Sequence, residues 1–157
     1  MILKTTTSNL PIFIEDTSKL ISHKQTLEAA EFILAFLFQG NEEKIKDIGR
    51  VEIFFSVGDI EDKDESGYTD PEKTSDNKTN FKIWVSERKN LRHQLITLFH
   101  ELVHVRQEMI DEAKLTDKES EDISNLPYED NPFEQEAFLK EVDLYKMWKK
   151  HKAQEKI

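Results

Sequence analysis

The residues with the clearest chemical meaning form an HExxH motif at positions 100–104. Apolar residues recur at helical spacing over 91–109, so we expect the motif to lie on an amphipathic helix. Residues four positions apart on a helix share one face, so the imidazoles of His100 and His104 can bind the same metal ion. Glu101 lies to one side, where it can take a proton from a metal-bound water. The sequence therefore predicts a zinc site (Zn2+) at His100 and His104, with Glu101 as the general base.

A zinc ion held by two histidines needs a third protein ligand, and only His151 follows the motif. Carboxylates are available at the start of the last predicted helix, which Asn131 caps and a proline opens. Glu134 continues the apolar stripe of that helix, whereas Glu136 points about 200° away. We expect Glu134 to be the third ligand and keep Glu136 in reserve; a capping-box bond from Glu134 to the Asn131 backbone is the alternative. Glu141, on the stripe of Glu134, is a candidate acceptor for an imidazole N–H.

These motifs resemble those of the gluzincin metallopeptidases, and in particular the minimal gluzincin-like proteins of phages and bacteria. The resemblance covers residues 81–148 and rests on the HExxH motif followed, 30 residues after its second histidine, by Glu134-x-x-Ala137. It departs from the family pattern at Phe138, where many gluzincins have an aspartate that orients a histidine. The resemblance implies a zincin-like α+β fold with a small antiparallel or mixed sheet, an HExxH helix and a C-terminal helix that carries the third ligand. It also implies that the strand at 81–86 is the sheet edge on which an extended peptide is laid.

Hydrophobic periodicity predicts the elements that must position these residues within one domain spanning 1–157. In chain order we expect an extended segment or edge strand at 10–14, a helix at about 17–39, strands at 51–57 and 81–86, a hydrophilic loop at 59–80, an irregular segment or short helix at 111–128, and a last helix from about 132 to 150. Pro11 argues against a central position for the first segment, because proline cannot donate a ladder hydrogen bond.

Composition excludes several other classes of function. The 157 residues carry a net charge of −10, which disfavours binding to nucleic acids, including a role as a DNA-linked protease, and to anionic membranes. The absence of cysteine excludes thiol chemistry and fits a cytoplasmic protein, and neither a secretory signal nor a membrane span is recognisable.

The sequence leaves two hypotheses about function. The first is a zinc metallopeptidase (a hydrolase) that acts on a peptide or protein substrate through a zinc-activated water and Glu101; His93, Tyr128 and Tyr145 are candidate donors to the transition-state oxyanion. The second is a catalytically idle zinc-binding protein whose acidic surface contacts a basic partner. The glutamate of the motif favours the first, because a structural zinc site has no use for a general base.

Overall fold

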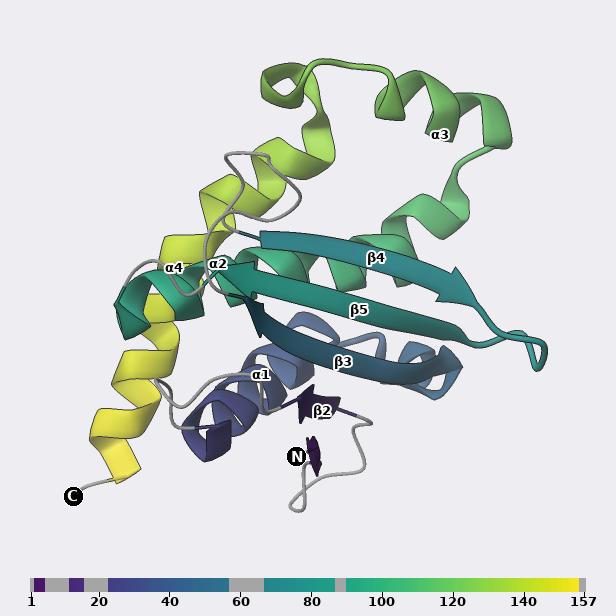
Figure 1. The fold of residues 1–157 in the computed structure, drawn as a ribbon. Coiled ribbons are helices and arrows are strands. Elements are labelled where there is room, and N and C mark those ends of the chain that lie inside the picture. The colour runs from purple at the N-terminus through teal and green to yellow at the C-terminus, as the bar shows by residue number, and fades with distance from the viewer. Residues whose placement is uncertain (1, 5–11, 16–22, 57–66, 87–89, 156–157) are drawn as a thin grey trace.

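Five strands form one mixed sheet in the order β1-β2-β3-β5-β4 in the computed structural model (Figure 1). The strands are β1 (Ile2–Lys4), β2 (Ile12–Glu15), β3 (Ile48–Ser56), β4 (Gly67–Lys73) and β5 (Thr79–Ser86). β2, β3 and β5 are parallel to one another, whereas β1 and β4 pair antiparallel with their neighbours at the two edges. The structure describes residues 2–4, 12–15, 23–56, 67–86 and 90–155.

Helical segments account for most of the remaining described chain. They are α1 (His23–Leu37), the 3-10 turn η1 (Glu42–Asp47), α2 (Leu91–Arg106), the π-helical turn η3 (Gln107–Asp111), the 3-10 turn η4 (Glu112–Lys114), α3 (Asp117–Ser124), the 3-10 turn η5 (Tyr128–Asp130) and α4 (Pro132–Glu155). α1 packs against α2, and α4 packs along α2. The segment that carries α3 projects from the body of the molecule between the end of α2 and the start of α4 (Figure 1).

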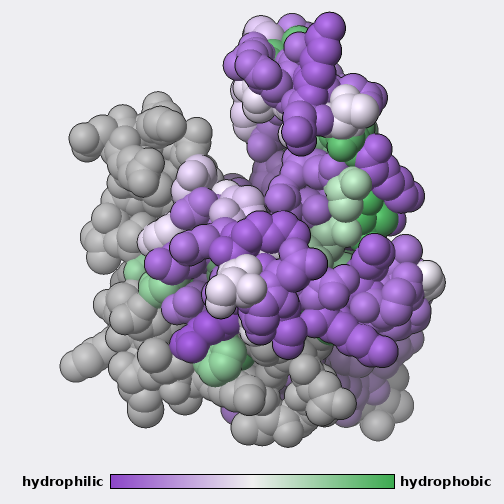
Figure 2. All heavy atoms as spheres, turned by 90° about the vertical axis from the view of Figure 1, so that its right-hand side faces the viewer, coloured by the Kyte–Doolittle hydropathy of each residue, from purple (hydrophilic) through white to green (hydrophobic). Residues whose placement is uncertain are grey.

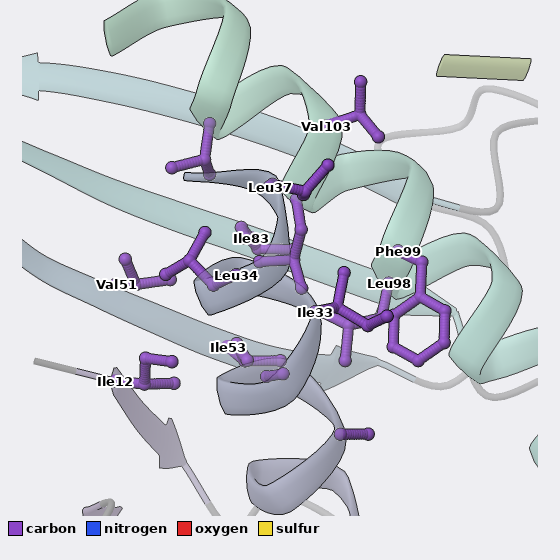
Figure 3. Close-up of a cluster of buried hydrophobic side chains, with 14 of the residues drawn as sticks. Ile12, Ile33, Leu34, Leu37, Val51, Ile53, Ile83, Leu98, Phe99 and Val103 are labelled. Atoms are coloured by element: carbon purple, nitrogen blue, oxygen red, sulfur yellow. The ribbon is translucent and has the colours of Figure 1, made fainter. Parts of the chain in front are cut away.

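The core lies between one face of the sheet and the helices α1 and α2. Its sheet side is formed by alternate apolar residues of β2, β3 and β5, and its helix side by the apolar stripes of α1 and α2. Figure 3 shows this layer, in which Ile33 and Leu34 of α1 and Leu98 of α2 face Ile53 and Ile83 of the sheet. The motif helix α2 is therefore fixed on its apolar side, which leaves its polar side to form a site. On the face shown in Figure 2, most of the described residues are hydrophilic.

The chain is a mixed α+β fold with one mixed sheet, as expected, but the predicted sheet edges are wrong. Residues 81–86 were expected at an edge, yet β5 pairs with β3 on one side and β4 on the other. The segment at 10–14 was expected to be an extended segment or an edge strand. Residues 10 and 11 lie outside the described part of the chain, and residues 12–14 are extended in β2, but β2 lies between β1 and β3. Its strand begins at Ile12, after the proline, so the missing N–H interrupts no pairing from that point.

The hydrophilic loop expected at 59–80 is wrong in its second half. Residues 57–66 lie outside the described part of the chain, but Gly67–Lys73 form β4 and β5 begins at Thr79. β4 is mostly exposed and carries charges and Pro71, features that protect an edge strand from further pairing. The true edge of the sheet beside α2 is therefore β4.

No helix in the described ranges is long and apolar enough to cross a membrane.

Candidate metal centre

His100 and His104 lie one turn apart on α2, which confirms the predicted helical setting of the motif. Asn90 caps this helix by accepting a hydrogen bond from the His93 backbone N–H, and the buried stripe of α2 fixes its rotation. The two imidazoles are largely buried, with side chains 12% and 17% exposed. Their Nε2 atoms are 3.3 Å apart, so both rings present the same nitrogen to one point.

Glu134 lies in the first turn of α4 and reaches both imidazoles. One carboxylate oxygen is 3.1 Å from His100 Nε2 and the other is 3.0 Å from His104 Nε2. The Asn131 side chain accepts hydrogen bonds from the backbone N–H groups of Phe133 and Glu134, and thereby caps the helix. The cap is thus supplied by the side chain that precedes the helix, while the Glu134 carboxylate points to the histidines.

The spacing of these donor atoms fits a metal ion. Donors about 2.0–2.1 Å from a tetrahedral ion lie roughly 3.3 Å from one another. The three separations between the two Nε2 atoms and the nearest Glu134 oxygens are 3.0, 3.1 and 3.3 Å. The ligand atoms of His100, Glu101 and His104 also lie within 4.8 Å of one another. Each Nε2 thus lies at about this separation from the other and from one oxygen of Glu134, and the group of His100, Glu101 and His104 could hold a metal ion.

Glu101 occupies a different position from the three converging residues. It is 4% exposed, and its Oε2 accepts a hydrogen bond of 2.9 Å from the Thr69 hydroxyl of β4. Its carboxylate is thus held against the edge strand, beside the histidines.

Each imidazole also has a partner at its other ring nitrogen. His100 Nδ1 is 2.8 Å from Oε2 of Glu141, which confirms the predicted contact of that glutamate. His104 Nδ1 is 2.7 Å from Oε1 of Gln107. A carboxylate or amide oxygen at Nδ1 fixes the proton there and leaves Nε2 as the metal-binding nitrogen. In the gluzincin pattern an aspartate at the position of Phe138 would orient a histidine, which phenylalanine cannot do. Glu141 and Gln107 are the groups that orient the two imidazoles here.

Glu136, the reserve ligand, does not contact the histidines directly. It accepts a hydrogen bond of 2.8 Å from Nε2 of Gln107, which also donates to the Phe133 carbonyl at 2.9 Å. Gln107 is 1% exposed and joins the C-terminal end of α2 to the start of α4. Glu136 thus contacts the histidines only through Gln107.

The two imidazoles and the carboxylates around them control one another's charge. Burial opposes the charged form of His100, but hydrogen bonds to Glu134 and Glu141 outweigh it and raise the pKa of His100 to about 10. The pKa of His104 is also raised, because its bond to Glu134 outweighs its burial. The pKa of Glu134 is well below its usual range because both imidazoles bind it, although burial acts in the opposite direction. The pKa of Glu101 is raised, chiefly by burial.

These groups line a cleft of about 960 Å³ between β4, α2 and the start of α4. Its walls include five glutamates, at positions 101, 108, 112, 134 and 141. Burial and a hydrogen bond with Glu108 raise the pKa of Glu112 to about 8. No lysine or arginine is among the described residues that line the cleft.

Two of the three candidate oxyanion donors line this cleft. Tyr128 and His93 do so, whereas Tyr145 lies outside the lining, with its ring 5.7 Å from the Arg92 guanidinium. Burial, the negative charge of Glu134 and a hydrogen bond to it raise the pKa of Tyr128 to about 12, so its hydroxyl keeps its proton.

Two site residues were not found by reasoning from the sequence. Thr69 was placed in the expected loop at 59–80, where the charges of the edge strand conceal its alternation. Gln107 lies outside the HExxH pattern and was not singled out from the sequence. Its position three residues after His104, on the same side of a helix, is a signal that could have identified it.

Comparison of the chain with protein-family models, with curated proteins and with solved structures finds no match.

Proposed function

We propose that the protein is a zinc-dependent metallopeptidase with a zincin-like fold. The observation that carries the proposal is the convergence of His100 Nε2, His104 Nε2 and the Glu134 carboxylate in a cleft, beside the separately held carboxylate of Glu101. Two imidazoles and one carboxylate are a common ligand set of catalytic zinc, which keeps a further position open for water or substrate. The donor spacing and the fixed Nδ1 partners support this choice of metal.

The residues of the chain then have distinct tasks. Bound zinc supplies a Lewis acid for the scissile carbonyl and lowers the pKa of a coordinated water. His100, His104 and Glu134 hold the ion, and Glu141 and Gln107 keep the imidazoles in the required tautomer. Glu101 accepts the proton of the attacking water and passes it to the departing amine. The burial that raises the pKa of Glu101 makes it a better proton acceptor than an exposed carboxylate.

We place the substrate strand along β4, in place of the strand at 81–86 that the resemblance implied. β4 is the edge of the sheet that borders the cleft, and its residues Gly67, Thr69 and Pro71 line it. An extended peptide can pair with the backbone of an edge strand with little sequence preference. Pro71 has no N–H to offer, so pairing is best between residues 67 and 70. Tyr128 is the favoured oxyanion donor, because its protonated hydroxyl lies beside Glu134.

Glu101→Gln tests this function because the amide keeps the shape of the side chain but cannot act as a base. We expect unchanged zinc content and a loss of hydrolysis of ~10²–10⁴-fold. The assay is cleavage of a mixture of unfolded proteins that includes basic chains, near neutral pH, with a chelator-treated wild type as control.

Cleavage that survives Glu101→Gln would refute the assigned role of Glu101. A wild type that holds one zinc per chain yet cleaves nothing would refute the peptidase and favour the zinc-binding interaction protein with an acidic surface.

A further inference from the structure

The carboxylate of Glu101 is held from outside its own helix. Glu101 is on α2, and the hydroxyl that donates to its Oε2 at 2.9 Å belongs to Thr69 on β4, 32 residues earlier in the chain. The same hydroxyl is 3.4 Å from the Glu101 backbone carbonyl. A carboxylate has two oxygens that accept hydrogen bonds, so a bond at Oε2 leaves the other oxygen for the cleft.

Gly67 allows β4 to come close enough for this bond. Gly67 and Thr69 are two residues apart on one strand and share a face, the face toward α2. A Cβ atom at position 67 would lie 2.6 Å from Cγ2 of Thr97 and 3.1 Å from Cγ of Glu101. A Cβ at position 67 would have to displace the Thr97 side chain and crowd that of Glu101, so glycine lets the strand backbone lie close to the motif helix. Thr69 then reaches Glu101 with a side chain that has a single rotatable bond to its oxygen.

We infer that Thr69 is the positioning residue for the general base, and that it aims the free oxygen of Glu101 at the attacking water. This inference rests on the proposed function. A glutamate side chain has three rotatable bonds, and a base acts only when its oxygen is within hydrogen-bond reach of the proton it removes. Fixing one oxygen to the edge strand removes most of that freedom before substrate arrives. The strand proposed to bind the peptide thereby also sets the direction of proton transfer.

The test compares Thr69→Val, which keeps the shape of threonine and removes the hydroxyl, with Thr69→Ser, which keeps the hydroxyl. The substrate is a synthetic peptide spanning a bond that the wild type cleaves. For Thr69→Val we expect kcat to fall roughly 10- to 100-fold, the range spanned by hydrogen bonds to charged groups. KM should change less than about twofold, because the substitution does not alter the contacts that bind the substrate equally in the ground state and the transition state. Thr69→Ser should recover most of kcat, and both variants should hold as much zinc as the wild type.

A second measurement does not depend on turnover. Acetohydroxamate gives up an acidic proton when it chelates zinc, and Glu101 is placed to receive that proton. Isothermal titration of the zinc-loaded proteins should show weaker acetohydroxamate binding for Thr69→Val than for Thr69→Ser and the wild type. In the Glu101→Gln background, Thr69→Val should cause no further loss, because the amide at position 101 cannot take the proton whatever its orientation.

The outcomes separate the two proposals. If the wild type cleaves peptides and Thr69→Val does so equally well, the positioning role is wrong while the peptidase stands. If Thr69→Ser is as impaired as Thr69→Val, the hydroxyl is not the cause and the inference is also overturned. If the wild type cleaves nothing, the peptidase fails, and the acetohydroxamate series alone decides whether Thr69 holds Glu101.

Discussion

Replacing Glu134 or Glu136 by alanine distinguishes a metal ligand from a group that acts through another residue. Glu134 reaches both Nε2 atoms at 3.0–3.1 Å, so its removal would delete one of the three proposed protein ligands. Roughly 10–16 kcal/mol of zinc binding shared by four ligands is about 2.5–4 kcal/mol for each, or on the order of 100- to 1000-fold in affinity. Glu136 reaches the histidines only through Gln107, and Gln107 can keep its bond to the Phe133 carbonyl when Glu136 is removed.

We therefore expect Glu134→Ala to weaken zinc binding by roughly 100- to 1000-fold and Glu136→Ala by less than about 10-fold. Gln107→Leu should fall between them, because partners of metal-bound imidazoles are typically worth about 10- to 100-fold. Competition with a chromogenic chelator measures these affinities, and circular dichroism shows whether each variant is folded. Equal losses for Glu134→Ala and Glu136→Ala, or a larger loss for the second, would show that our choice of ligand is wrong.

Two further predictions concern pH and the approach of β4 to α2. In the metal-free protein the charged form of His100 contributes stability that is complete below pH 6.5 and is lost as the pH rises toward about 10. Urea midpoints of the chelator-treated protein should therefore fall over this pH range. Zinc affinity should rise over the same range, because the imidazole nitrogens must lose their protons before they bind the metal. Urea midpoints that do not change with pH would contradict the contacts assigned to His100. Gly67→Ala should destabilise the fold by about 1–3 kcal/mol and also reduce kcat, since the added methyl lies 2.6 Å from Thr97. Gly40→Ala is its control: Gly40 has a φ of 82° and open space around it, so the substitution should cost stability but not kcat.

The parts of the site that the sequence predicted are those set by helical geometry. The spacing of His100 and His104 requires only that the segment be helical, and the apolar stripe of 91–109 is strong enough to ensure this. Asn131 and the proline after it mark the start of α4 at Pro132, as observed. Once that start is known, the helical repeat alone separates the direction of Glu134 from that of Glu136.

The sheet edges could not be predicted in this way. The alternation of apolar and polar residues along a strand indicates which of its faces is buried, but it does not indicate which strands lie beside it. Residues 81–86 alternate because one face of β5 is buried, which is true of a central strand as well as an edge strand. β4 was missed for the complementary reason. Its exposure leaves no apolar face to detect, and its charges and Pro71 are typical of loops as well as of protected edges.

Contacts between distant segments were also outside the reach of periodicity. Thr69 meets Glu101 only because β4 lies beside α2, and Gln107 meets Glu136 only because α4 begins near the end of α2. Neither pair is close in the chain, so each depends on the tertiary arrangement.

The burial of Glu101 favours an enzyme over a purely structural metal site. A buried carboxylate costs free energy unless it is paired, and an apolar residue at this position of α2 would pack without that cost. The fold nevertheless keeps Glu101 4% exposed and supplies a dedicated hydroxyl from the edge strand to hold it. Its neighbours Leu102 and Val103 on the same helix are fully buried and apolar, so this part of the helix does not in general carry polar residues. Proton transfer to and from a metal-bound water requires a carboxylate that lies beside the candidate ligands and is held in place, as Thr69 holds Glu101. A structural metal site would gain nothing from such a carboxylate.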